Sequence, residues 1–418
     1  MALSKEANDF INLFLPAIHK IKPIQKDNKK IFKELYKKIY LSHQYANLFI
    51  QNNEIQKTVV EIDEKNKSTM LAKYSLLKTD SFIQKDIKTN IYKNIKSIHM
   101  YDFKINGIQI YFHHVITSMN VNIDAKIAQY LKKIILMYHL LLSYYKTGEV
   151  ESLQITYVPL TLKKKLPDRP GKILTSNNIN TALTYPCKKN GEILIYRHEE
   201  WFKVLIHESM HSICYDFGGL NMGIDIKSIL KNMFNVNSDF YITETYSEFW
   251  ANIINTAILS FTHAPNKKSY SEFMQNFNIL HQFEQLFSLF QCVKILDYMG
   301  LSYGEIISKE AKDKNKCLRK YREDSNIFAY YILKSIWFFN SDIFLSWFDN
   351  HNTFLIYSQK TSNYLKNLLA MTKKYYNKDE LLTIIKHIEK IFNTIQIQNK
   401  TNNDVQFDIL ETLQMSLF

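Results

Sequence analysis

Glycine and proline are scarce in this chain, which has 9 glycines and 7 prolines among 418 residues. Seven of the glycines lie between Gly107 and Gly223, and four of the prolines lie between Pro159 and Pro186. Both residues punctuate turns, so we expect strands and tight connections in this middle part. The segments on either side of it are expected to be mainly helical.

Cysteine is also rare, with residues at positions 187, 214, 292 and 317 and no C-x-x-C pair. The N-terminal residues show no basic start leading into an apolar run, as an export signal would. Long apolar runs are absent too: Ile327–Phe348 is interrupted by charged residues, and Ile134–Tyr145 is too short to span a bilayer. These absences predict a soluble, intracellular protein with free thiols and no membrane partner.

Arginine occurs only at positions 169, 197, 319 and 322, although the formal net charge is +13. Almost all of the positive charge therefore comes from lysine. Arginine is the usual side chain for bidentate contacts with phosphates and bases, so its scarcity argues against a nucleic-acid partner. A lysine-rich nucleic-acid binder is the last of the alternatives, and its binding would fall steeply with salt.

The sequence H-E-x-x-H, formed by His207, Glu208 and His211, lies within a largely apolar segment over residues 201–219 that is typical of a buried helix. Residues four apart on a helix are neighbours on one face, so the two imidazoles can hold one metal ion together. Glu208 points to an adjacent side, where it can act as a general base on a metal-bound water. Zinc would still need a third protein ligand. The pattern predicts zinc-assisted attack of water on a carbonyl group.

The residues that flank this segment fit a helix. Glu199 and Glu200 are expected in its first turn, where negative charge suits the helix dipole. Gly218 and Gly219 are expected to end it.

The third ligand has to come from elsewhere in the chain. An extended H-E-x-x-H-x-x-G-x-x-H pattern fails, because Cys214 and Phe217 occupy its glycine and histidine positions. Asp225 and Asp239 remain open as ligands.

A helix expected over residues 241–255 offers a better source. It carries Glu244 and Glu248 four residues apart, and therefore on one side. One carboxylate could bind the metal while the other accepts a hydrogen bond from the far nitrogen of His207.

The H-E-x-x-H sequence, followed by the E-T-Y-S-E-F-W-A segment that starts at Glu244, resembles the gluzincin metallopeptidases, particularly the ligand helix of anthrax lethal-factor-like peptidases. The resemblance covers residues 198–256. It implies one zinc ion (Zn2+) held by His207, His211 and Glu244, with Glu248 orienting His207 and Glu208 as the catalytic base. It also implies a polypeptide substrate and an endopeptidase rather than an exopeptidase.

In the lethal-factor pattern, a tyrosine seven residues before the ligand glutamate stabilises the oxyanion. Asn237 occupies that position here. Tyr241, Tyr246 and Tyr215 are the candidates for the role in this chain.

The middle part is expected to form strands over Ile108–Ile116, Leu153–Val158, 180–185 and Glu192–Tyr196, with a long helix over 123–145. By the resemblance, one strand before the metal helix is an exposed edge that pairs with an extended substrate. We expect this edge at 178–185. Its residues are Asn180, Thr181, Ala182 and Leu183.

These patterns predict an α+β protein with a zincin-like domain over residues 101–262, a helical N-terminal region over 1–100 and a helical C-terminal region over 263–418. The alternative is a catalytically inactive zincin-like protein with a structural or interaction role. Abundant lysine, asparagine, isoleucine and tyrosine are what an AT-biased genome encodes. With a zincin motif, this composition indicates a large DNA virus as the source, and the host cytoplasm or the virion as the location.

Overall fold

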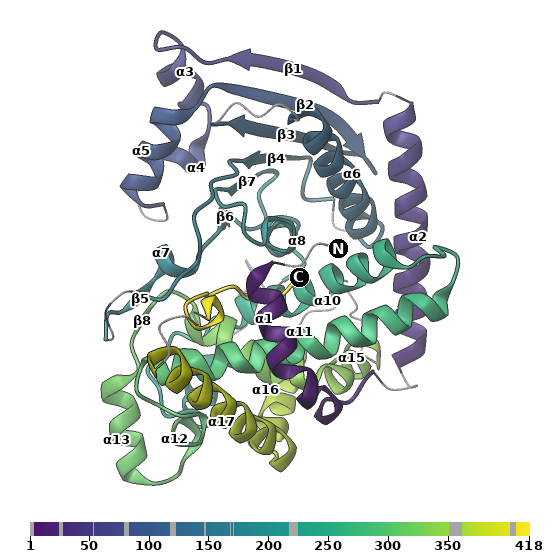
Figure 1. Ribbon diagram of the computed structural model, residues 1–418. Helices are drawn as coiled ribbons and strands as arrows, with labels where there is room; N and C mark the ends of the chain where they lie inside the picture. Colours follow the sequence, from purple (N-terminus) through teal and green to yellow (C-terminus); the bar gives the residue numbers. More distant parts are fainter. Residues whose placement is uncertain are drawn as a thin grey trace.

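The computed structural model describes residues 4–24, 28–52, 54–78, 83–117, 123–145, 148–167, 169, 171–216, 225–350, 362–401 and 407–418. The described chain combines helices with a mixed six-stranded sheet, which confirms the α+β class (Figure 1). Among the described residues, no helix combines the length and apolar character needed to cross a membrane.

The sheet has the strand order β1-β2-β3-β4-β7-β6. Its strands are β1 (Gln56–Glu61), β2 (Ser97–Ile105), β3 (Ile108–Ile116), β4 (Ser152–Tyr157), β6 (Ala182–Thr184) and β7 (Asn190–Ile195). The central strands β3, β4 and β7 run parallel, and β1, β2 and β6 pair antiparallel with their neighbours. β1 and β6 are therefore the two edges of this sheet.

The hairpin between β2 and β3 turns through Asn106 and Gly107. Both residues have positive φ, 47° and 89° respectively, and Ile105 pairs directly with Ile108. This is the two-residue turn that Asn-Gly favours, because both central positions need the left-handed region. β1 and β2 lie partly or wholly in the first hundred residues, where the sequence patterns predict helices alone.

Helices cover both faces of the sheet. On one face lie α2 (Lys29–Gln51), α6 (Ile123–Leu142) and α8 (Trp201–Ser212), and on the other α3 (Lys67–Leu71), α4 (Ser75–Lys78) and α5 (Lys85–Asn94). α10 (Ile242–His263) packs against α8 on one side and against α11 (Tyr270–Tyr298) on the other, so it joins the sheet to a helical body (Figure 1).

The helical body contains the rest of the chain after α11. Its elements are α12 (Tyr303–Ile307), α13 (Ala311–Lys320), β8 (Glu323–Asp324), the π-helix η3 (Phe328–Leu333), α14 (Lys334–Phe339), α15 (Ser341–Asn350), α16 (Ser362–Tyr375), α17 (Asp379–Thr401) and η5 (Asp408–Leu410). The remaining elements are α1 (Lys5–Phe14), η1 (Leu15–Lys20), β5 (Leu174–Thr175), α7 (Ser176–Ile179) and α9 (Ile226–Lys231). β5 pairs with β8 in a small second sheet.

One hydrophobic cluster extends from Ala7 in α1 to Leu417 near the other end of the chain. The predicted divisions after residues 100 and 262 fall inside β2 and in the last turn of α10. The division into three domains stays a prediction.

Candidate metal centre

Helix α8 carries the H-E-x-x-H sequence and is buried around its whole circumference. It begins at Trp201, after Glu200 in the left-handed region with φ 55°. The expectation that Glu199 and Glu200 form the first turn is therefore wrong. Both carboxylates instead accept hydrogen bonds from neighbouring segments: Glu199 from the Lys164 backbone N–H at 2.6 Å, and Glu200 from the Met415 backbone N–H at 2.9 Å.

The other end of α8 also differs from the expectation. The helix ends at Ser212, and the chain turns through Cys214, which has φ 62°. Gly218, Gly219 and Phe217 lie outside the described residues.

Three side chains from α8 and α10 converge on one point. The His207 and His211 Nε2 atoms lie 3.1 Å apart, and the Glu244 Oε2 atom lies 3.2 Å from the first and 3.3 Å from the second. A tetrahedral ion with ligand bonds of about 2.0–2.1 Å holds its ligand atoms roughly 3.3 Å apart. The triangle therefore fits a zinc-sized ion. Among the described residues, His207, His211 and Glu244 form the cluster whose ligand atoms lie close enough together to hold a metal ion.

The far nitrogen of each imidazole meets a second carboxylate. His207 Nδ1 lies 3.0 Å from Glu248 Oε2, and His211 Nδ1 contacts Asp216. The side chains of Glu248 and Asp216 are almost fully buried. Such contacts fix the ring orientation and leave the Nε2 lone pairs for a metal. The i, i+4 spacing on α10 predicts the Glu248 contact, whereas Asp216 was missed.

Glu248 also belongs to a buried chain of ion pairs. It contacts Lys203, which lies one helical turn before His207 on α8, and Lys203 is 3.9 Å from Glu200. Glu200 in turn pairs with Lys164 at 2.7 Å. The two lysines and two glutamates are at most 4% exposed in their side chains. Each buried charge thus has an opposite charge beside it, which offsets the cost of leaving water.

The pKa values of the three glutamates at this site, Glu208, Glu244 and Glu248, are set by burial and by the charges beside them. Burial raises the pKa of the Glu208 carboxyl, and the nearby His207 and His211 partly offset this. Burial also opposes ionisation of Glu244, but the two histidines hold its pKa well below the usual range. Lys203 and His207 likewise lower the pKa of Glu248 against the effect of burial. Glu244 and Glu248 are therefore anionic at neutral pH, as a ligand and an orienting group need to be.

A small cavity of about 50 Å³ opens beside the triangle. Glu208 lines it from α8, Asn180, Thr181 and Ala182 from the segment that enters β6, and Met415 from the C-terminal segment. β6 is an edge of the sheet and contacts α8, and it contains two of the four predicted edge residues, Ala182 and Leu183. Asn180 and Thr181 precede the strand, and residues 178 and 179 belong to α7, so the edge is shorter than the expected range of 178–185. Leu183 faces away and packs in the cluster that α3, α4 and α5 cover.

The three tyrosines predicted as oxyanion candidates do not line this cavity. Tyr241 precedes α10 and is 52% exposed, and the Tyr215 hydroxyl donates to the Leu141 carbonyl oxygen at 2.6 Å. Tyr246 is buried against Trp250.

Tyr330 lines the cavity instead. Its hydroxyl donates to Glu244 Oε2 at 2.8 Å, and its ring lies 5.9 Å from that of His207. It comes from the π-helix η3, and such segments are frequent at functional sites. The sequence around Tyr330 is rich in aromatic residues, and nothing in its pattern distinguishes Tyr330 from its neighbours.

The two other acidic residues considered as metal ligands have different contacts. Asp225 accepts a hydrogen bond from the Ser228 backbone N–H at 2.9 Å and caps α9. Asp239 pairs with Lys227 at 2.6 Å. Neither belongs to the metal-ligand group.

The prediction of four free thiols is wrong for two of them. Cys187, between β6 and β7, forms a disulfide with Cys214, just after α8, while Cys292 and Cys317 are free and buried. The backbone N–H groups of Cys187 and Cys214 both donate to the His211 carbonyl oxygen, at 3.3 and 3.1 Å. The pairing depends on the loop before β7 folding back onto the end of α8, and the sequence spacing does not reveal that.

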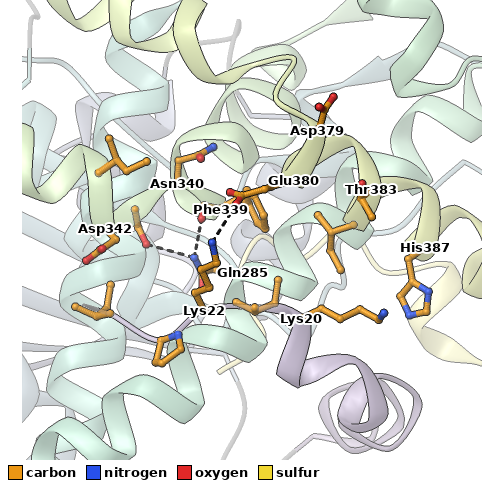
Figure 2. A pocket seen from close by; sticks show the side chains of 16 residues that line it. Lys20, Lys22, Gln285, Phe339, Asn340, Asp342, Asp379, Glu380, Thr383 and His387 are labelled. Atoms are coloured by element: carbon orange, nitrogen blue, oxygen red, sulfur yellow. Dashed lines mark hydrogen bonds and ion pairs between the residues drawn. The ribbon is translucent and has the colours of Figure 1, made fainter. Parts of the chain in front are cut away.

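A larger cavity, of about 460 Å³, lies away from the metal centre (Figure 2). It is formed by the segment over Lys20–Ile24, the α14–α15 junction and the first turns of α17. The ion pair between Lys22 and Glu380, 3.0 Å long, crosses it, and Gln285 donates to the Phe339 carbonyl oxygen within it. Its charges are mixed, and the described residues that line it form no metal-ligand group. The candidate site is therefore defined by converging side chains and not by the size of a cavity.

Comparison with protein-family models, with curated proteins and with solved structures gives no match to the chain. The candidate site therefore depends on its own geometry.

Replacing Asp216 with asparagine is expected to weaken zinc binding roughly ten- to hundredfold, because the carboxylate that orients His211 is lost. Competition with a chelator of known affinity measures the change. Asp239→Asn is the matched control, since the same atom is replaced in an exposed ion pair. Equal zinc affinity in both variants would contradict an orienting role for Asp216.

Proposed function

We propose that this protein is a zinc-dependent metallopeptidase of the gluzincin type, with a zincin-like arrangement of edge strand, H-E-x-x-H helix and ligand helix. The observation that carries the proposal is the triangle of His207, His211 and Glu244 atoms, with sides of 3.1–3.3 Å. Glu248 and Asp216 support it, because they leave both Nε2 atoms free to face the same point.

His207, His211 and Glu244 would hold one zinc ion. When bound, the ion would polarise the scissile carbonyl and lower the pKa of a water beside it. Glu208 takes the proton from the attacking water and then passes it to the leaving amine. Glu208 lines the cavity, and its raised pKa favours uptake of the proton from the attacking water.

Tyr330 is the group placed to stabilise the negative charge that develops on the carbonyl oxygen. Burial and the neighbouring Glu244 raise the pKa of its phenol well above the usual range, so the hydroxyl keeps its proton at neutral pH. The hydroxyl has a single proton, so on substrate binding it would turn from Glu244 Oε2 to the carbonyl oxygen held beside that ligand.

The substrate that fits this site is an extended polypeptide. The free edge of β6 lies on one side of the cavity, where a substrate can add a further strand through backbone hydrogen bonds. β6 also contacts α8, and Ala182 and Glu208 line the same cavity.

The small volume of the cavity favours a second candidate, a zincin-like protein without catalytic activity. About 50 Å³ holds little more than one or two water molecules. Movement of β6 or of the segment around Met415 would be needed to admit a peptide.

Elemental analysis and a cleavage assay of the purified full-length chain test the two candidates together. The peptidase proposal predicts about one zinc ion per chain and internal cuts in an unfolded polypeptide, read by mass spectrometry. Bound zinc without any cleavage would favour the inactive candidate. Absence of zinc binding would reject both the metal centre and the peptidase.

Replacing Tyr330 with phenylalanine is expected to lower kcat by about 10²–10³-fold with little change in KM or in bound zinc, because one donor to the transition state is lost. Steady-state kinetics on a cleaved peptide measure both constants. Tyr241→Phe removes the same hydroxyl from an exposed tyrosine outside the cavity and should have no effect. If kcat falls in Tyr241→Phe and not in Tyr330→Phe, the group that stabilises the oxyanion is Tyr241 instead.

A further inference from the structure

A separate cavity, of about 200 Å³, lies at the carboxyl ends of the three parallel strands. Residues at the ends of β3, β4 and β7 form it together with the first turns of α6. The described residues that line it are His114, Val115, Ile116, Thr117, Ile123, Lys126, Tyr130, Pro159, Thr161 and His198. It shares no residue with the cavity beside Glu208.

The chain connects β3 to β4 through α6, so these elements form a parallel β-α-β unit. In such units, ligands bind beyond the carboxyl ends of the strands, and the first N–H groups of the helix attract anions. α6 is 20 residues long, and Ile123 and Lys126 of its first turns line the cavity. The location alone would favour an anion but does not define a site.

His114 provides an independent indication of a ligand. It is 4% exposed and lines the cavity from β3, yet neither of its ring nitrogens has a hydrogen-bond partner among the described residues. Aromatic rings surround it, with Tyr157 at 5.4 Å and Tyr130 at 5.8 Å. A buried imidazole without partners is costly, so a ligand that supplies them would be bound at a net gain.

Burial lowers the pKa of His114 to about 4, so its ring is neutral at neutral pH. A neutral imidazole carries one N–H donor and one acceptor nitrogen. A protonated phosphate oxygen can satisfy the acceptor, and an unprotonated one can satisfy the donor.

The other polar groups of the cavity suit an anion. Lys126 supplies a positive charge, Thr117 and Thr161 supply hydroxyl groups, and the lining contains no acidic side chain among the described residues. The acidic residue in the first turn of α6, Asp124, is paired with Lys57 at 3.0 Å and is not part of the lining.

We propose that this cavity binds a phosphate group, either as the free ion or as a small phosphomonoester, between His114, Lys126 and the start of α6. A volume of about 200 Å³ lies below the range of roughly 300–1,000 Å³ that holds drug-sized ligands. It therefore suits a tetrahedral oxyanion with a short carbon chain rather than a nucleotide. The proposal does not depend on the peptidase function, because the two cavities are separate.

Calorimetric titration of the full-length chain with inorganic phosphate, and separately with glycerol phosphate, tests this proposal. His114→Leu and Lys126→Gln should each weaken phosphate binding about tenfold or more. The matched control is Lys132→Gln, which makes the same charge change on α6 outside the cavity lining and should bind as the unchanged chain does. Tighter binding of glycerol phosphate than of phosphate would identify a phosphomonoester as the better ligand.

Thermal unfolding of the same variants shows whether a loss of binding reflects a loss of fold. His114→Leu removes two buried polar atoms without partners, so it should unfold at the same or a higher temperature. If His114→Leu fails to fold, the phosphate affinities of Lys126→Gln and Lys132→Gln are compared instead, and a weaker affinity in Lys126→Gln supports the proposal. The proposal is overturned if phosphate does not bind. It is also overturned if neither His114→Leu nor Lys126→Gln weakens binding, which is the result expected if phosphate binds at the metal centre instead.

Discussion

Glu208→Gln is expected to lower peptide hydrolysis by about 10²–10⁴-fold while leaving bound zinc unchanged, because an amide cannot take the proton of the attacking water. The three metal-ligand atoms belong to other residues, so the ion should still bind. The substitution preserves the shape of the buried side chain and removes a charge that burial disfavours, so the fold should be retained or stabilised.

Parallel measurements of zinc per chain and of kcat/KM make this prediction specific. Glu310→Gln makes the same change at an exposed residue before α13 and should leave both quantities unaltered. Retained zinc with undiminished hydrolysis would reject Glu208 as the base. Lost zinc would instead show that the side chain supports the metal centre.

Glu244→Gln is expected to weaken zinc binding by more than about a hundredfold. This loss is larger than the one expected for Asp216→Asn, because Asp216 only orients a ligand and does not bind the ion itself. The anionic Oε2 atom lies within 3.3 Å of both Nε2 atoms, and an amide there leaves the ion with one charge fewer. Hydrolysis should fall with metal occupancy and partly return at high zinc concentration.

The same experiment distinguishes Glu244 from the other acidic residues considered. Asp225→Asn and Asp239→Asn should keep full zinc affinity, because these side chains contact Ser228 and Lys227 instead. If one of these two variants loses zinc while Glu244→Gln keeps it, the third ligand is the aspartate replaced in that variant and not Glu244.

The parts of the fold that could be predicted from sequence are those with strong periodicity. β3, β4, β7 and α6 follow the expected ranges within a few residues, because their apolar residues repeat with the period of a strand or helix. β1 was missed since all but one of its residues are exposed, and no apolar face marks it. β2 could have been recognised from Asn106 and Gly107, which mark a hairpin that leads into β3.

The residues of the candidate site were likewise predicted only where a local spacing in the sequence indicated them. The contacts of His207, His211, Glu244 and Glu248 follow from two i, i+4 spacings, and each spacing is local in sequence. Tyr330 is 86 residues from the Glu244 it contacts, so only the packing of η3 against α10 brings them together. Asp216 was missed although it is only five residues after His211, because it lies past the end of α8, where helical spacing no longer predicts contacts.

The π-helix η3 determines the direction in which the Tyr330 side chain points. A π-helix holds one residue more per turn than the α-helix that follows it in α14. Without that extra residue, everything before Lys334 would rotate by roughly 100° about the axis, and the Tyr330 phenol would swing away from Glu244. Deleting one residue from η3 is therefore expected to turn this hydroxyl out of the cavity while the surrounding helices keep their packing.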